Sequence, residues 1–224
     1  MTAVILQSRL DSSRLPGKAL LDLGGEPMVY RVMQTLCLVP ADVRVLACPD
    51  DSRDAFEPLA ARVGFLLVTG SKEDVLGRYC KAIRETGADR VIRATGDNPF
   101  VFPDAAAEID RQGREINADY AAFGDLPYGA GVESIRAEAL LQAEREAVST
   151  RDREHVCPYL YGNPSLFRLH RPPAPLRWRF PLIRITVDTA QDLERARALY
   201  TLLDEATPTG ERVITACLKL ERPA

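Results

Sequence analysis

Residues 3–18 read A-V-I-L-Q-S-R-L-D-S-S-R-L-P-G-K, an apolar run followed by a polar loop. Ala3–Gln7 predicts a buried strand, because its apolar residues are unbroken and the loop follows at once. The loop carries the cations Arg9, Arg14 and Lys18, with two hydroxyls and a glycine among them. Such cations suit phosphate oxygens, so the loop is either a triphosphate site or a solvated surface loop. The loop matches neither the P-loop pattern nor the glycine pattern of dinucleotide-binding proteins. A P-loop kinase and a dinucleotide-dependent dehydrogenase are therefore disfavoured.

Downstream of this strand, short β-like runs alternate with helical periods. The further apolar runs predict strands at Val43–Ala47, Phe65–Val68 and Val91–Ala94. The helical periods predict helices that begin at Pro27, near Ser52, at about Val75 and at Pro103. This alternation predicts an α/β fold with a mostly parallel sheet flanked by helices. Ligands bind such sheets beyond the carboxyl ends of the strands, where the polar loops stand.

The second half of the chain is less regular. We expect residues 1–224 to form one domain with an irregular insertion at about 119–181, which contains a helix near Arg136–Val148. Leu182–Val187 predicts another buried strand.

Two helices are expected to close the chain. The first is capped by Thr189 with Asp192, a variant of the capping box. Its expected inward residues are Leu193, Ala196, Tyr200 and Leu203. The second lies near Glu211–Leu220, and its expected inward residues are Val213, Ile214, Cys217 and Leu218.

Composition and charge exclude several classes of protein. The formal net charge of −3 over 224 residues argues against a general polyanion binder, so a nucleic-acid partner is not expected. No apolar run approaches the roughly 20 residues of a membrane helix, and residues 1–10 lack a signal-peptide core. The five cysteines are scattered and form no C-x-x-C pair, which argues against a disulfide framework or a zinc site. We therefore expect a cytoplasmic protein with no membrane partner.

Two aspartates stand at the ends of predicted strands. Asp97 follows the strand that ends at Ala94, and Asp188 follows Val187 directly. If these strands are neighbours, both carboxylates emerge at one edge and can share a Mg²⁺ ion, which takes one or two carboxylates together with phosphates and water. The alternative roles are structural: Asp188 would assist Thr189 in capping a helix, and Asp97 would form a turn.

Residues 5–28, I-L-Q-S-R-L-D-S-S-R-L-P-G-K-A-L-L-D-L-G-G-E-P-M, resemble the opening signature of the cytidylyltransferases. The resemblance is to the spore-coat polysaccharide biosynthesis (SpsF-like) branch, which is related to 3-deoxy-manno-octulosonate (Kdo) cytidylyltransferase. The other matching blocks are 73–76 with Arg78, 95–97, 129–133, 153–156 and 184–189. Together they cover nearly the whole chain and imply a Rossmann-like nucleotidyltransferase fold of the glycosyltransferase-A type.

The resemblance implies a reaction in which an acceptor oxygen attacks the α-phosphorus of CTP and pyrophosphate leaves. The implied cofactor is Mg²⁺, and the implied partners are CTP and a sugar or sugar-acid acceptor used for surface polysaccharides. The implied catalytic residues are Arg14, Lys18, Asp97 and Asp188, the two aspartates being the metal ligands. The implied nucleotide-binding residues are Gln7, Ser8, Arg9, Ser13, Arg14, Lys18, Ser71, Asp74 and Arg78. The implied acceptor-binding residues are Glu133, Glu154 and His155, and relatives suggest a homodimer.

Two positions depart from the family pattern. Asp11 stands where relatives usually have glycine, and Phe102 replaces a common aspartate. These departures leave open an acceptor that is not a sugar, such as a phosphonate or a hydroxy amino acid. A further alternative is a protein that binds a nucleotide or nucleic acid without catalysis, through the basic stretch 163–184.

Overall fold

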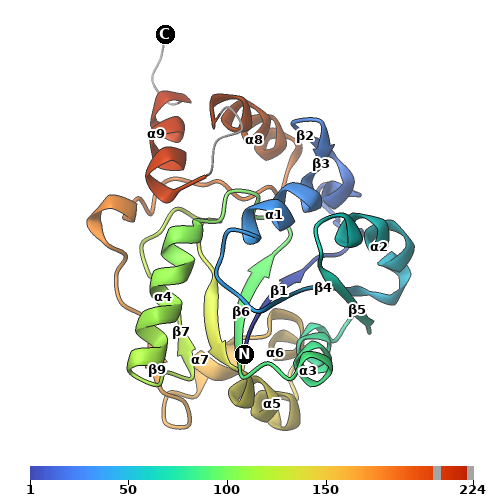
Figure 1. The fold of residues 1–224 in the computed structure, drawn as a ribbon, viewed down its shortest axis with the longest axis vertical. Helices are drawn as coiled ribbons and strands as arrows, with labels where there is room; N and C mark the ends of the chain where they lie inside the picture. Colours follow the sequence, from blue (N-terminus) through green and yellow to red (C-terminus); the bar gives the residue numbers. More distant parts are fainter. Residues whose placement is uncertain (204–207, 221–224) are drawn as a thin grey trace.

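The central sheet holds the amino-terminal half of the chain together. The computed structural model describes residues 1–203 and 208–220, and its main sheet has the strand order β5-β4-β1-β6-β8-β7-β9 (Figure 1). Four parallel strands form one side of this sheet: β1 (Thr2–Gln7), β4 (Val43–Pro49), β5 (Leu66–Gly70) and β6 (Arg90–Thr95). Because these strands are parallel, the loops after them meet at one edge. The four strands predicted in this half of the chain are confirmed, although β5 begins and ends later than its apolar run.

The rest of the sheet is short and of mixed direction. β8 (Glu133–Arg136) pairs antiparallel with both β6 and β7 (Tyr120–Ala121), and β9 (Leu169–His170) pairs parallel with β7. A separate hairpin is formed by β2 (Asp22–Leu23) and β3 (Glu26–Pro27). The sheet is therefore mostly parallel, as predicted.

Helices cover both faces of the sheet because the buried strands are apolar on both sides. In β1, Ala3 and Ile5 face one core while Val4 and Leu6 face the other. The first core is covered by α3 (Val75–Thr86), α5 (Ala137–Glu146) and α7 (Pro158–Gly162), while α6 (Thr150–His155) lies against α3 and buries none of its own side chains. The second is covered by α1 (Met28–Leu36), α2 (Arg53–Arg62) and α4 (Pro103–Glu115). Each fully buried aliphatic side chain contributes about 1.5–3 kcal/mol to these cores.

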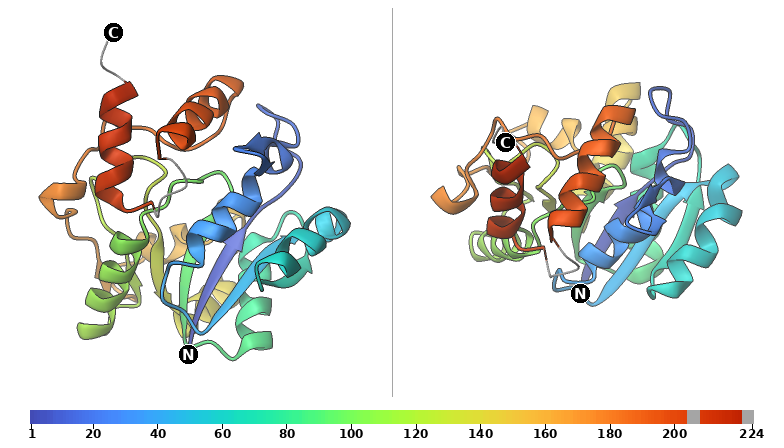
Figure 2. Two further views of the ribbon diagram at one scale, coloured as in Figure 1. Left: turned by 45° about the horizontal axis from the view of Figure 1, so that its top comes forward. Right: turned by 90° about the horizontal axis from the view of Figure 1, so that it is seen from above.

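A third core lies beyond the carboxyl edge of the sheet. It is built by α8 (Ala190–Leu203) and α9 (Gly210–Leu220), which stand side by side there (Figure 2). Phe102 is fully buried in this core, so its departure from the family pattern is a packing feature. Leu218 is 41% exposed, so its predicted inward position is wrong, whereas Leu199 is buried.

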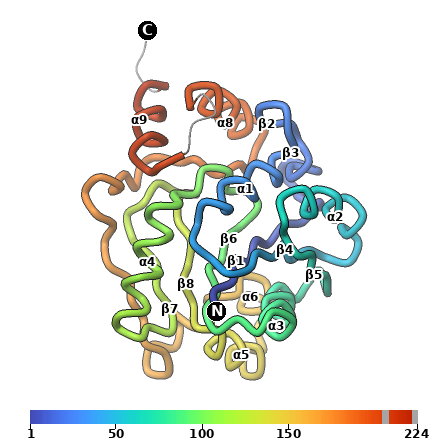
Figure 3. Tube along the Cα trace, in the orientation of Figure 1, coloured from blue at the N-terminus to red at the C-terminus, as the bar shows by residue number. Residues whose placement is uncertain are grey.

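The predicted strand Leu182–Val187 does not form. Leu182 is 99% exposed, and the segment makes only an isolated bridge between Tyr128 and Arg184. Ile183, Ile185 and Val187 are nevertheless buried, because they pack beneath α8 and α9 instead of joining the sheet. The chain reaches this place along one side of the molecule after β9 (Figure 3), through the 3₁₀ turn η3 (Leu176–Trp178). Two more 3₁₀ turns, η1 (Lys18–Leu20) and η2 (Asp50–Ser52), follow β1 and β4.

Gly129 allows the segment before Asp188 to approach its neighbour closely. Its φ is +100°, and a Cβ there would lie 2.7 Å from the Thr186 nitrogen. We expect Gly129→Ala to lower the free energy of unfolding by about 2–3 kcal/mol, because a left-handed conformation and a backbone overlap both oppose the new methyl group. Gly25→Ala is the matched control, since Gly25 has φ +83° but no atom within 4 Å of a new Cβ. Urea unfolding of the two variants measures the difference; equal losses would contradict the close approach.

Candidate active site

The loop after β1 and the loop after β6 are joined at the carboxyl edge of the sheet. The Gly96 amide donates to the Gln7 carbonyl oxygen at 2.8 Å. A Cβ at Gly96 would lie 2.6 Å from Ser8 Oγ, so glycine is needed for this approach. The Val187 amide in turn donates to the Asp97 carbonyl oxygen at 2.8 Å. Three stretches distant in sequence therefore converge, and Asp97 and Asp188 stand together as predicted.

Lys18 lies between the two aspartates. Its Nζ donates to Asp188 Oδ1 at 3.1 Å, to the Val187 carbonyl at 2.8 Å and to Asp97 Oδ2 at 3.5 Å. Gly17, in a left-handed conformation, turns the chain so that η1 starts at Lys18. The Lys18 side chain is only 14% exposed. The last cation of the first loop is therefore directed into the site.

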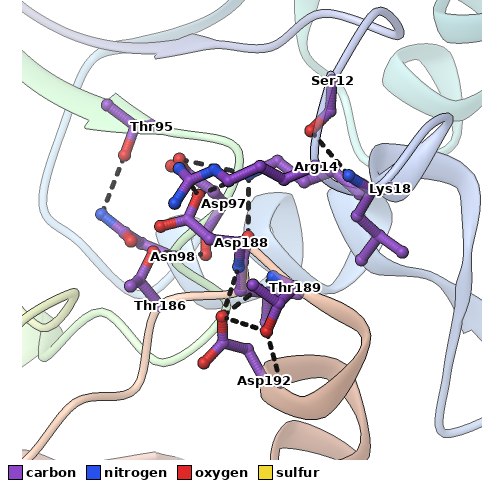
Figure 4. Close-up of polar contacts among 12 residues, drawn as sticks. Ser12, Arg14, Lys18, Thr95, Asp97, Asn98, Thr186, Asp188, Thr189 and Asp192 are labelled. Atoms are coloured by element: carbon purple, nitrogen blue, oxygen red, sulfur yellow. Dashed lines mark hydrogen bonds and ion pairs between the residues drawn. The ribbon is translucent and has the colours of Figure 1, made fainter.

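Asp188 receives two further cations. Arg14 Nη2 lies 2.9 Å from its Oδ1 (Figure 4). Arg184 Nη2 donates to its Oδ2 at 2.6 Å. Burial opposes ionisation of Asp188, but the hydrogen bond and charge of Lys18, with the other cations, outweigh it and lower its pKa. The Asp188 carboxyl is therefore ionised at neutral pH. Thr189 and Asp192 cap α8 just below it, as predicted.

The lowered pKa of Asp188 predicts a pH dependence of stability. A carboxyl group whose pKa falls on folding stabilises the protein above its unfolded pKa, and this stabilisation is lost as pH falls through the folded pKa. We expect the unfolding free energy of the wild type to drop faster than that of Asp188→Asn below about pH 4. Urea titrations at stepped pH measure both slopes. Parallel curves for the two proteins would rule out the shift.

The rest of the first loop is more open. Arg9 is half exposed and lies 3.9 Å from Glu154 and 3.8 Å from Asp11. Asp11 also forms an ion pair with Lys72 after β5. The aspartate that replaces the family's usual glycine therefore links the loop after β1 to the loop after β5. Ser13 is exposed in the same loop. Arg9 thus has no tight partner among the described residues and can meet a ligand at little cost.

The predicted residues after β5 mainly hold their own loop. Arg78 is buried and donates to the carbonyl oxygens of Ser71 and Lys72, and burial lowers its pKa. Asp74 accepts from the Gly77 amide at 2.9 Å as the cap of α3 and pairs with Arg153. These contacts give the loop a fixed shape beside the end of β4.

The predicted acceptor residues lie in two places. Glu154 stands near Arg9, and His155 is exposed at the end of α6. Glu133 instead pairs with Arg93, its direct neighbour across β6 and β8, and accepts from the Tyr120 hydroxyl at 3.3 Å. The structure does not bring these three side chains into one contact cluster among the described residues.

Sequence reasoning assigned no place in the site to two cations, Arg93 and Arg184, although Arg184 belongs to a matching block and to the basic stretch 163–184. Arg93 left a signal, since it is a charged residue within the otherwise apolar run Val91–Ala94. Arg184 gave a weaker signal, because it belongs to a basic stretch that is equally typical of a solvated surface.

The donor set around Asp97 and Asp188 fits a hard divalent cation. No third His, Cys, Asp or Glu joins them in a metal-binding cluster within residues 1–203 and 208–220. Mg²⁺ commonly uses one or two carboxylates and completes its shell with phosphates and water. The Lys18 ammonium already shows that the space between the two carboxylates attracts positive charge.

Comparisons with known proteins identify the group to which this arrangement belongs. A family model described as "Cytidylyltransferase" matches residues 3–212. The chain belongs to the cytidylyltransferase family. It is 36% identical over 203 residues to the spore coat polysaccharide biosynthesis protein SpsF of Bacillus subtilis, covering 88% of this chain and 85% of that protein. It is 29% identical over 217 residues to the 3-deoxy-manno-octulosonate cytidylyltransferase of Chlorobium luteolum, covering 92% and 82%.

Solved structures agree on the fold of this cytidylyltransferase. A cytidylyltransferase from Leptospira borgpetersenii superposes with a TM-score of 0.87 at 20% identity, covering 100% of this chain and 98% of that chain. A CMP:2-keto-3-deoxy-manno-octonic acid synthetase complexed with CTP gives 0.69 at 19% identity, covering 89% and 98%. The Rossmann-like nucleotidyltransferase fold is therefore confirmed, and this cytidylyltransferase is a CTP-dependent nucleotidyltransferase. Within residues 1–203 and 208–220, no helix has the length and apolar character to cross a bilayer.

Proposed function

We propose that this cytidylyltransferase transfers CMP from CTP to a sugar or sugar-acid acceptor, with Mg²⁺ as cofactor, in surface polysaccharide biosynthesis. One observation carries the proposal: Arg14 and Lys18 converge on Asp97 and Asp188 at the carboxyl edge of the sheet. Phosphoryl transfer needs positioning and charge stabilisation more than covalent help from the protein, and this cluster supplies both signs of charge.

The cations of the first loop would bind the triphosphate. Arg14 is 63% exposed and Lys18 has a flexible stem, so both can turn from Asp188 towards phosphate oxygens. Arg9, further out on the loop, would meet the same group. Backbone atoms of Gln7 and Ser8 would approach the nucleotide.

The two carboxylates would hold the metal when it binds. Mg²⁺ there would neutralise charge that develops on the phosphates. An oxygen of the acceptor forms a bond to the α-phosphorus and, where it is a hydroxyl oxygen, gives up its proton to water. The bond from that phosphorus to the bridging oxygen breaks, and pyrophosphate leaves with the electron pair. Lys18 and Arg14 would stabilise the charge on the leaving pyrophosphate, which is the largest charge change in the reaction.

The nucleoside would lie against the loop after β5. Ser71, Asp74 and Arg78 are the residues we assign to this side, with Arg78 acting by fixing the carbonyl groups of the loop. A rigid loop presents its backbone groups in one geometry, which is what discrimination among bases requires.

The acceptor would bind towards residues 119–181, which carry Glu133, Glu154 and His155. A sugar acid brings a carboxylate as well as hydroxyl groups, and Glu154 stands beside the triphosphate loop, 3.9 Å from Arg9. Glu133, already neutralised by Arg93, would accept hydrogen bonds from sugar hydroxyls without repelling an anion.

The nucleic-acid alternative has little support from the basic stretch 163–184. Arg184 is committed to Asp188, and Arg179 donates to the Ala174 carbonyl oxygen at 2.8 Å. Arg168 donates to the Ile116 carbonyl oxygen at 2.8 Å. Because these arginines already bind groups of the protein itself, the stretch is poorly suited to bind the phosphates of a nucleic acid.

The proposal is tested by pyrophosphate release from CTP and Mg²⁺ with a panel of sugar acids, phosphonates and hydroxy amino acids. Mass spectrometry of the product identifies the acceptor and separates the sugar from the non-sugar alternative. Thermal shifts with CTP, UTP, ATP and GTP test the base. A protein that shows no shift with CTP and no release with any acceptor would refute the proposal.

A further inference from the structure

The Lys18 ammonium occupies the position that a metal ion would need. It contacts Asp188 Oδ1, Asp97 Oδ2 and the Val187 carbonyl oxygen at 3.1, 3.5 and 2.8 Å. These three acceptors match the three N–H groups of an ammonium, so Lys18 is fully satisfied where it stands. A divalent ion between the same carboxylates would meet its charge at close range, where like charges repel strongly.

The cations around Asp188 differ in how easily they can leave. Arg184 is fixed, because it lies over the Tyr128 ring at 4.8 Å and 3.7 Å from Asp192. The Lys18 ammonium stands at the end of a flexible side chain, and the Arg14 side chain is 63% exposed, so both can move. Lys18 and Arg14 also share the same Asp188 oxygen, Oδ1, whereas Arg184 holds Oδ2. Departure of the two movable cations therefore uncovers one oxygen of Asp188 and the carboxylate of Asp97 together.

We propose that Lys18 is a resident cation that blocks the metal position until the nucleotide draws it away. The inference rests on the proposed function, because it assumes that triphosphate and metal use this cluster. Phosphate oxygens of the nucleotide attract Lys18 and Arg14, and the uncovered carboxylates then accept the metal. Nucleotide and metal therefore bind with positive coupling, and by linkage each raises the affinity for the other by the same factor.

The experiment measures Mn²⁺ binding to nucleotide-free protein by the EPR signal of the unbound ion. Mn²⁺ is the probe because it takes the same oxygen ligands as Mg²⁺. We expect Lys18→Met to bind Mn²⁺ about tenfold more tightly than the wild type, since methionine fills the space of the stem without the charge. The wild type should gain about the same factor when an α,β-methylene analogue of CTP, which cannot release pyrophosphate, is added.

Three variants make the result specific. Lys18→Arg keeps the charge and should bind Mn²⁺ as weakly as the wild type. Lys18→Met with Asp188→Asn should lose the gain. Lys219→Met, an exposed lysine on α9, is the matched control for loss of one positive charge and should change nothing. Circular dichroism establishes that each variant is folded; Lys18→Gln replaces Lys18→Met if the latter is not.

The outcomes separate this inference from the proposed function. If Lys18→Met, or Lys18→Gln in its place, binds Mn²⁺ no more tightly than the wild type, the resident-cation role is wrong, even if the wild type turns over CTP. A tenfold gain without turnover of CTP by the wild type supports the resident-cation role and overturns the proposed reaction instead.

Discussion

Asp188→Asn and Asp97→Asn should each lower kcat/KM for pyrophosphate release by about a thousandfold. Each substitution removes one anionic ligand from the proposed metal position, and loss of one electrostatic element of this kind typically lowers the rate by about 10²–10³-fold. Asp188 should show the larger loss, because it also aligns Lys18, Arg14 and Arg184. Steady-state release of pyrophosphate, with the acceptor identified in the screen, measures the effect.

Asp89→Asn is the control for these variants, because Asp89 is 70% exposed and directly precedes β6, at the opposite end of that strand from Asp97. It should retain wild-type kinetics. Thermal unfolding establishes whether Asp188→Asn is folded, since the substitution leaves three cations around a neutral amide. If both folded variants keep activity within about threefold of the wild type, the metal assignment is wrong; a threefold change corresponds to well under 1.36 kcal/mol.

The amino-terminal half of the fold could be predicted because its signals are local. The run Ala3–Leu6 is buried on both faces, and the helix from Val75 has its cap at Asp74 and its end at Gly87. The segment 182–187 shows the limit of such reasoning. Ile183, Ile185 and Val187 alternate as in a half-buried strand, yet their partners are α8, α9 and two loops, which no local pattern specifies.

The sequence predicted correctly that Asp97 and Asp188 meet at one edge of the sheet, but it predicted the wrong structure for the segment that carries Asp188. Asp97 and Asp188 do emerge together, although no strand carries Asp188; the Val187 amide and the Thr186 hydroxyl both donate to the Asp97 carbonyl oxygen and hold the segment there. The position of Lys18 between them could not be predicted, because it depends on the path of a loop. The pairing of Glu133 with Arg93 depends on the register of β6 and β8, which the sequence pattern does not reveal.

Arg93→Met should lower the free energy of unfolding by about 3–5 kcal/mol, because it leaves the Glu133 carboxylate largely buried without its counter-charge. The two side chains are 12% and 22% exposed, and the Tyr120 hydroxyl at 3.3 Å is a weak replacement for an ion pair. Burial disfavours the charge on Arg93, but Glu133 outweighs it and raises the pKa of the guanidinium. Guanidinium chloride unfolding, monitored by circular dichroism, measures the loss.

A second substitution distinguishes an unpaired charge from a packing defect. Arg93→Met combined with Glu133→Gln removes both charges, so it should regain at least half of the lost stability; a packing defect would remain in full. Arg111→Met is the control for a surface pair, because Arg111 is 55% exposed beside Glu108, and it should lower stability far less than Arg93→Met. If the double variant is no more stable than Arg93→Met, the loss comes from the missing side-chain packing, and the explanation by an unpaired charge is wrong.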